Sequence, residues 1–345
     1  MTHFIDDFPG RNIKTDKGEF LYFGGTAYLG LQTNKDFQEL FIKNIRKYGT
    51  NYGASRKSNV RFSLYGEAEN YLAHLVGSEA CVTLSSGYMA SQLVSQFFNG
   101  NKFAVYVAPH THESLLQTSL LPYKTYAGLK KDIEKNTLGT TPVILLDSID
   151  FMGINYPDFE GLKSLPLKKC IVIADDSHGL GILGKKGEGI YKQLQALNAK
   201  ELVVCGSLGK GFGVQCGAIF GTKQRIDQLT KTAFFGGASP AGPATLATLI
   251  ESPPILNAQR ENLNNNLIFF KSLLADNNLF MHIGQHPTFT FMDEGLTKHL
   301  YENNILVTSF NYPKEDSPLM SRIVISAFHT KKDIETLAEA INLYA

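Results

Sequence analysis

The chain has 345 residues, of which 43% are hydrophobic and 19% charged, as is usual for a globular protein. Its 33 Lys and Arg residues nearly balance its 32 Asp and Glu residues, and a net charge of +1 gives no electrostatic argument for binding nucleic acid or an acidic membrane. The sequence shows no secretory signal, no apolar run of membrane-spanning length and four singly spaced cysteines, so we expect a cytoplasmic protein with reduced thiols.

Residues 1–40 are mixed in character, with one strand-like run at Glu19–Phe23. From residue 41 to residue 252, short apolar runs alternate with helical patterns, which predicts parallel strands joined by helical crossovers. We therefore expect a large α/β domain with a mainly parallel central sheet and helices on both of its faces. Its expected strands are Ala80–Leu84, Ala104–Val107, Val143–Asp147, Ile171–Ala174, Leu202–Cys205 and Cys216–Phe220.

The pattern changes at about residue 253. A long polar helix at Leu256–Ala275 is followed by two strand-like runs, Thr288–Met292 and Ile323–Ala327, and by a closing amphipathic helix. This indicates a small α+β domain formed by residues 253–345. We expect the N-terminal segment, residues 1–40, to pack with it.

Two of the central strands run into ionisable residues. The strand 171–174 leads directly into Asp175, with His178 three residues later, and the strand 202–205 is followed by Lys210 in a glycine-flanked turn. Open parallel sheets bind ligands beyond the carboxyl ends of their strands. A lysine amine can form a Schiff base with an aldehyde, and a buried carboxylate can keep a pyridine nitrogen protonated. These three residues therefore suit pyridoxal 5′-phosphate (PLP), although each one alone also fits an ordinary capping or loop residue.

Two glycine patterns nearby do not predict a nucleotide site. Gly179–Gly184 matches G-x-G-x-x-G, but four residues separate it from its strand and another loop follows it, where a dinucleotide site requires a helix. The segment around Lys210 is not a P-loop, because Val204 occupies the position of the first glycine and Gly211 that of the Ser/Thr.

Ser86, Gly87 and Tyr88 follow the strand 80–84 and begin a helix. The backbone N–H groups of a helix N-terminus can bind an anion such as a phosphate, and Ser207 could add a hydroxyl. Ser86 could equally be an ordinary helix cap, and the two roles are compatible.

His112 follows the strand 104–107 and could stack on a planar cofactor ring. Together with His110 it has an H-x-H spacing, but no third ligand is placed by the sequence, so we expect no metal site. Arg322 is expected to open the last strand, where it could bind a carboxylate or form a surface salt bridge.

Taken in order, these motifs resemble those of the α-oxoamine synthase family, PLP-dependent enzymes of the aspartate-aminotransferase fold (fold type I). The resemblance covers most of the chain, and no single motif carries it. The motifs are Ala27-Tyr28-Leu29-Gly30-Leu31, Gly53-Ala54-Ser55-Arg56, Ser86-Gly87-Tyr88-Met89-Ala90, His112-Glu113-Ser114, Asp175-Asp176-Ser177-His178-Gly179 and Gly209-Lys210-Gly211-Phe212-Gly213.

The resemblance implies a role for each of the residues above. Lys210 matches the Schiff-base lysine that also removes the Cα proton, and Asp175 the partner of the pyridine nitrogen. His178 matches a contact to the cofactor's 3′-oxygen, and His112 the histidine stacked on the ring. The remaining implied contacts are phosphate contacts by Ser86, Gly87, Tyr88 and Ser207, and substrate contacts by Arg322 and Thr26.

The implied reaction condenses an α-amino acid with an acyl thioester, carried by coenzyme A or an acyl carrier protein, and releases CO₂ to leave an α-amino ketone. Family members are homodimers with the active site between the subunits. The implied partners are therefore an amino acid, an acyl thioester and a second copy of the chain.

The sequence departs from the family pattern at several positions. Thr26 replaces an asparagine, and Phe151-Met152-Gly153 lacks a serine. A hydroxyl-bearing segment of the family becomes Phe235-Gly236-Gly237-Ala238, and Val324 replaces the second arginine of Arg-x-Arg. These changes leave two alternatives open. One is a PLP-dependent aminotransferase or aldolase-type lyase on the same scaffold, and the other is a non-catalytic protein that keeps the fold.

Overall fold

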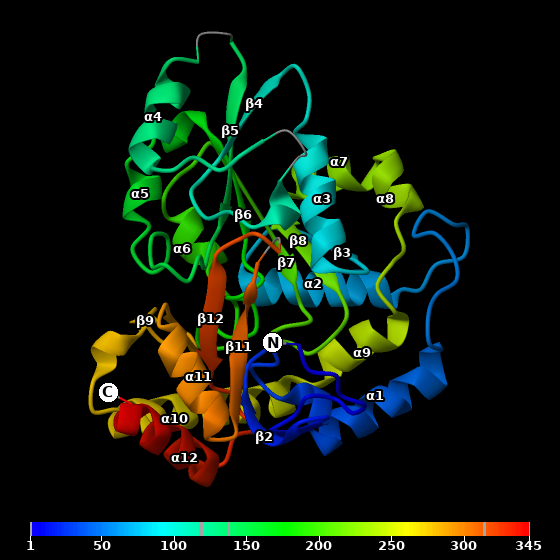
Figure 1. Ribbon diagram of the computed structural model, residues 1–345. Coiled ribbons are helices and arrows are strands. Elements are labelled where there is room, and N and C mark those ends of the chain that lie inside the picture. The colour runs from blue at the N-terminus through cyan, green and yellow to red at the C-terminus, as the bar shows by residue number, and fades with distance from the viewer. Residues whose placement is uncertain (1, 117–119, 137–138, 313–314, 345) are drawn as a thin grey trace. The chain divides into compact units, whose positions relative to one another are not determined.

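The computed structural model describes residues 2–116, 120–136, 139–312 and 315–344 (Figure 1). The chain divides into two compact units. The smaller unit combines Met1–Gln38 and Pro254–Ala345 with the short internal segment Phe151–Gly153. The larger unit consists of Glu39–Asp150 and Ile154–Pro253.

The larger unit contains a six-stranded sheet in the order β3-β8-β7-β6-β5-β4. Four neighbours, β4 to β7, pair in parallel, whereas β8 is antiparallel to both β7 and β3. The expected α/β fold with a mainly parallel sheet is therefore confirmed. The strands are β3 (Ala80–Leu84), β4 (Phe103–Val107), β5 (Thr141–Asp147), β6 (Ile171–Asp175), β7 (Glu201–Ser207) and β8 (Gly217–Gly221).

The antiparallel direction of β8 follows from a short connection. Only Leu208–Cys216 joins β7 to β8, too few residues for a helical crossover, so the chain must turn back along its own strand. Lys210 lies in this connection. It therefore stands at the carboxyl end of β7, at the same edge of the sheet as the carboxyl end of its parallel neighbour β6.

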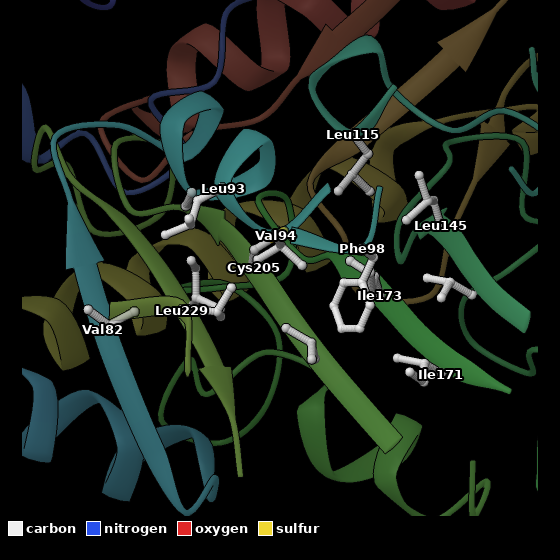
Figure 2. Close-up of a cluster of buried hydrophobic side chains, with 14 of the residues drawn as sticks. Val82, Leu93, Val94, Phe98, Leu115, Leu145, Ile171, Ile173, Cys205 and Leu229 are labelled. Carbon is white, nitrogen blue, oxygen red and sulfur yellow. The ribbon is translucent and has the colours of Figure 1, made fainter. Parts of the chain in front are cut away.

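The core of the larger unit lies between α3 (Gly87–Phe97) and the sheet. In Figure 2, Leu93, Val94 and Phe98 lie over the strands that carry Cys205 and Ile173. All five side chains are at most 1% exposed. Burial of this size stabilises a side chain by about 1.5–3 kcal/mol, so it anchors α3, whose first turn carries Gly87.

The remaining helices of this unit are short or amphipathic. They are α1 (Lys35–Tyr48, which begins in the smaller unit), α2 (Leu64–Val76), α4 (Tyr126–Glu134), α5 (Glu160–Lys163), α6 (Tyr191–Gln195), α7 (Lys223–Thr230), α8 (Ala233–Gly237) and α9 (Pro243–Glu251), with 3₁₀ turns at η2 (Glu113–Leu115) and η3 (Leu167–Lys169).

The smaller unit contains a second six-stranded sheet, in the order β1-β2-β11-β12-β10-β9. Its strands are β1 (Asn12–Thr15), β2 (Gly18–Phe23), β9 (Met281–His282), β10 (Thr288–Phe291), β11 (Ile305–Asn311) and β12 (Leu319–Val324). Its helices are α10 (Pro253–Leu273), α11 (Glu294–Glu302) and α12 (Lys331–Tyr344), with 3₁₀ turns at η1 (Leu31–Thr33) and η4 (Asn277–Leu279).

The expected position of the last strand was wrong. The sequence favoured Ile323–Ala327, but β12 spans Leu319–Val324, so Arg322 is the fourth of its six residues and does not open it. The pairing with β10 and β11 fixes this register, since Arg322 lies opposite both Thr290 and Thr308. Beyond β12, the N–H of Ile325 donates to the carbonyl of Pro287, outside the regular ladder.

Among the described residues, no helix is both long and apolar enough to cross a bilayer.

Candidate active site

The ends of β6 and β7 bring the predicted imidazole and amine together. Lys210 Nζ lies 2.9 Å from His178 Nε2. The two strand ends are also joined through the backbone, because the N–H of Ser207 donates to Ser177 Oγ at 2.8 Å. The close approach favours a glycine at position 206, where a Cβ atom would lie 3.0 Å from the nitrogen of Ser177.

The glycines of the G-x-G-x-x-G match serve packing. A Cβ atom on Gly181 would lie 2.6 Å from the carbonyl carbon of Gly211, and one on Gly179 would lie 2.1 Å from Asp176 Oδ1. The loop after β6 therefore packs directly on the loop that carries Lys210. This agrees with the interpretation that the motif does not bind a nucleotide.

Asp175, the last residue of β6, faces three hydrogen-bond donors. Its Oδ2 accepts from Ser91 Oγ at 3.1 Å and from Ser114 Oγ at 3.2 Å, and its Oδ1 accepts from the N–H of Ser177 at 2.9 Å. Asp175 is only 8% exposed. Several donors around one carboxyl group fix its orientation.

His112 lies directly before the 3₁₀ turn η2 and is fixed at two points. Its backbone N–H donates to Asp147 Oδ1 at 3.1 Å, and its Nδ1 accepts the N–H of Ser114 at 3.0 Å. Because Nδ1 accepts, the neutral ring carries its proton on Nε2. Ser114 Oγ connects the ring to Asp175, since it lies within hydrogen-bond distance of both.

The sequence did not single out Asp147 or Ser91, and Ser114 entered only as the last residue of the motif His112-Glu113-Ser114, with no role of its own. Asp147 ends β5 and pairs in register with Asp175 on β6. Burial, followed by the negative charge of Asp175, raises the pKa of Asp147 well above its usual value. The rule that drew attention to Asp175, an acid at the carboxyl end of a buried strand, would also have found Asp147. Ser91 and Ser114 offer no comparable signal.

A second buried acid, Asp176, forms hydrogen bonds that hold a loop in place. It is fully buried, its Oδ1 accepts from Ser148 Oγ at 2.7 Å and its Oδ2 from the N–H of Ile190 at 3.0 Å. Burial raises the pKa of Asp176 to about 7. It holds the loop that carries His178.

The start of α3 forms a tight cradle with Ser207. Ser86 caps the helix by accepting the N–H of Met89 at 3.2 Å, so its side chain has the capping role that the sequence allowed. Gly87 is pressed against Ser207, and a Cβ atom on Gly217 would lie 2.0 Å from the carbonyl oxygen of Ser86. Ser207 Oγ accepts the N–H of Gly209 at 3.2 Å, which leaves its own proton to donate.

Tyr88, the second residue of α3, is 60% exposed. Its backbone N–H belongs to the first helical turn, where such groups have no partner within the helix. Together, Gly87, Tyr88 and Ser207 present donors of the kind that an anion requires.

The two predicted substrate residues belong to the smaller unit. Arg322 lies on β12, and its guanidinium carbon is 4.0 Å from the centre of the Phe151 ring. Phe151 has a φ of 57°, a conformation that bulky residues rarely adopt. Its ring packs edge-on against the ring of His286, with 5.2 Å between the two ring centres. Thr26 lies in the exposed stretch after β2.

The family-like segment Gly53-Ala54-Ser55-Arg56 has structural contacts. Arg56 forms a two-pronged ion pair with Glu69 at 2.8 and 3.0 Å and lies 4.0 Å from the centre of the Tyr65 ring. Ser55 Oγ donates to the carbonyl of Gly236 at 2.6 Å, which ties this segment to α8.

Comparison with known proteins gives a consistent result. Residues 20–341 match the family described as aminotransferase class I and II. The chain is 27% identical over 357 residues to an 8-amino-7-oxononanoate synthase of Thermosipho melanesiensis, covering 95% of this chain and 91% of that one. It is 29% identical over 355 residues to the enzyme of that name from Petrotoga mobilis, covering 96% and 90%.

Among solved structures, the serine palmitoyltransferase of Sphingomonas wittichii has a similar fold. It superposes with a TM-score of 0.82 at 16% identity, covering 99% of this chain and 91% of that one.

Proposed function

This chain belongs to the class I and II aminotransferase family, and on that basis we propose that it is a PLP-dependent C-acyltransferase of the α-oxoamine synthase type. The resemblance to the α-oxoamine synthases is confirmed by its 8-amino-7-oxononanoate synthase relatives. The proposed reaction joins the Cα of an α-amino acid to the acyl carbon of a thioester. The C–S bond breaks to release the thiol, the amino acid loses CO₂, and an α-amino ketone remains.

The residues present fit PLP. The cradle of Gly87 and Ser207, which a Cβ atom on Gly87 would fill, suits the phosphate. Asp175, with its three donors, suits the protonated pyridine nitrogen, and Lys210 suits the aldehyde. When bound, PLP would draw electrons away from the Cα of an attached amino acid.

The protein's own groups would perform the proton transfers. Lys210 Nζ would take the Cα proton, and His178, at 2.9 Å, would hold that amine in place. Asp175 would keep the proton on the pyridine nitrogen because its carboxylate is buried and fixed. His112 would cover the ring and exclude water from one face, and Arg322 and Thr26 would bind the substrate carboxylate.

The observation that best supports the proposal is the contact between Lys210 and His178 beside Asp175. We propose alanine and a pimeloyl thioester as the first substrates to test, which would make the reaction a step of biotin biosynthesis. The test is to load the protein with PLP, add single amino acids and then add acyl-CoAs. Release of free CoA together with CO₂ supports the proposal.

The alternative of an aminotransferase or aldolase-type lyase is favoured by one observation. Phe151 occupies the position of a family serine, and its ring lies against Arg322. Formation of pyridoxamine phosphate from an amino acid and PLP, without any thioester, would favour transamination. Cleavage of a β-hydroxy amino acid would favour a lyase, and a protein that takes up no PLP would have neither activity.

We further propose that the protein works as a homodimer, as the family resemblance implies. Light scattering should give twice the mass of the 38.1 kDa chain. A monomer that retains full activity would reject this part of the proposal.

A further inference from the structure

The hydroxyl of Ser114 lies between two residues of the proposed site. Ser114 Oγ is 3.2 Å from Asp175 Oδ2 and 2.9 Å from His112 Nδ1. Ser114 is 4% exposed, so water does not compete freely for these contacts. Its position is set by Ser95 and Gln92 of α3, which donate to the carbonyls of Leu115 and Ser114 at 2.8 Å.

A serine hydroxyl has one proton and two lone pairs, so Ser114 Oγ can donate to only one of its two neighbours at a time. Asp175 Oδ2 is an acceptor. Nδ1 of His112 is also an acceptor, because it already takes the backbone N–H of Ser114. The hydroxyl proton therefore lies between a carboxylate and an imidazole, and removing the hydroxyl takes a neighbouring donor away from both.

We propose that Ser114 is a positioning residue that couples the ring of His112 to the carboxylate of Asp175. This inference rests on the proposed function, in which His112 covers the cofactor ring and Asp175 binds its nitrogen. One connected unit of Asp175, Ser114 and His112 would then contact both the face and the nitrogen of the cofactor ring.

Asp147 completes this unit from the neighbouring strand. It accepts the backbone N–H of His112 at 3.1 Å and lies beside Asp175 in the sheet. The backbone of His112 is thus fixed by β5, whereas its ring is fixed by Ser114. A change at Ser114 should therefore turn or retautomerise the ring without releasing the backbone.

The chain contains a matched control for this proposal. Ser91 Oγ donates to the same oxygen of Asp175 at nearly the same distance, 3.1 Å, and Ser91 is fully buried. Ser91 Oγ has Cys205 Sγ as its other neighbour, at 3.5 Å, in place of a histidine. Ser91→Ala and Ser114→Ala each remove one donor from Asp175, but only Ser114→Ala removes a contact to His112.

The test uses the full chain, ¹⁵N-labelled at histidine and free of cofactor, with tautomers read from two-bond ¹H–¹⁵N spectra at pH 8. His112 is assigned by the signal lost in His112→Gln. In the wild-type protein we expect the Nε2–H tautomer. Ser114→Ala should raise the Nδ1–H fraction at least threefold, Ser91→Ala should leave it unchanged, and Ser114→Thr should restore the wild-type spectrum.

Identical His112 signals in the wild type and Ser114→Ala would overturn the proposal, and so would equal changes in the two alanine variants. If Ser114→Ala does not fold, Ser114→Cys, with its weaker donor, should raise the Nδ1–H fraction, and an unchanged spectrum would again overturn it. Because the spectrum is recorded without PLP, it is independent of the proposed function. A protein that never takes up PLP would reject the function and leave this coupling intact.

Discussion

A Cβ atom on Gly87 would lie 2.6 Å from the Cβ of Ser207, closer than two carbon side chains can approach. The first turn of α3 and the end of β7 can therefore lie this close only because residue 87 has no side chain. Both the helix N-terminus and the Ser207 hydroxyl belong to the proposed phosphate cradle, so its geometry depends on this one glycine.

Gly87→Ala should weaken PLP binding by at least about tenfold, which corresponds to about 1.4 kcal/mol. The added methyl group must push α3 away from Ser207, and the donors then no longer converge. Titration of the purified protein with PLP, followed by absorbance, measures the effect. The matched control is Gly66→Ala in the first turn of α2, where a Cβ atom meets nothing within 4 Å. Equal PLP affinity in all three proteins would contradict the cradle.

Asp175→Asn should keep part of the PLP affinity and lose most of the Cα-deprotonation activity. The amide is nearly the same size but has no charge with which to keep the pyridine nitrogen protonated. Exchange of the Cα proton of the amino acid for deuterium, followed by NMR, measures this step alone. An Asn variant that exchanges at the wild-type rate would refute the role of Asp175.

Phe151→Leu should raise the KM for the amino acid by about 2- to 30-fold, because cation–π contacts contribute about 0.5–2 kcal/mol. The guanidinium of Arg322 lies over the Phe151 ring, and a leucine offers no ring face. Phe151→Tyr keeps the ring and should stay near the wild-type KM. Steady-state kinetics with each variant decide the matter, and a Leu variant with unchanged KM would show that Phe151 does not orient Arg322.

The contribution of His329 to stability should fall as the pH falls from 6.5 towards 4, because His329 must be neutral in the folded protein. His329 accepts the N–H of Ser326 at its Nδ1 and contacts the carbonyl of Tyr22 at 3.0 Å. Burial lowers the pKa of His329 to about 4. His329 therefore takes up a proton at a higher pH in the unfolded chain than in the folded chain. This difference lowers the free energy of unfolding by up to about 3 kcal/mol at pH values below 4.

Urea unfolding at several pH values measures this dependence. His329→Phe should be less stable at pH 7, since two hydrogen bonds are lost, but it should show a shallower decline between pH 6.5 and 4. Parallel curves for the wild type and the variant would exclude His329 as the cause.

Much of the fold could be predicted from the sequence because buried parallel strands are continuous apolar runs. The six strands of the larger unit appear within a few residues of their expected bounds. The direction of β8 depends on the length of its connection, and the expected strands already left a connection too short for a helical crossover. The position of β12 is set by pairing with β10 and β11, so the apolar run Ile323–Ala327 was misleading.

The residues at the site were predictable only where a sequence rule applied. Asp175 and Lys210 stand out as ionisable groups at strand ends. Ser91 and Ser114 become recognisable only once folding brings them within hydrogen-bond distance of Asp175, from positions 84 and 61 residues away. The contact of Phe151 with Arg322 likewise joins distant parts of the chain.

The most direct test of the central claim is to trap PLP on Lys210. The purified protein is loaded with PLP, treated with borohydride and digested, and the modified peptide is identified by mass spectrometry. Lys210→Ala serves as the negative control. We predict a single phosphopyridoxyl group on the Lys210 peptide and none in the variant. A protein that stays unmodified, or that carries the group on another lysine, would contradict the proposed function.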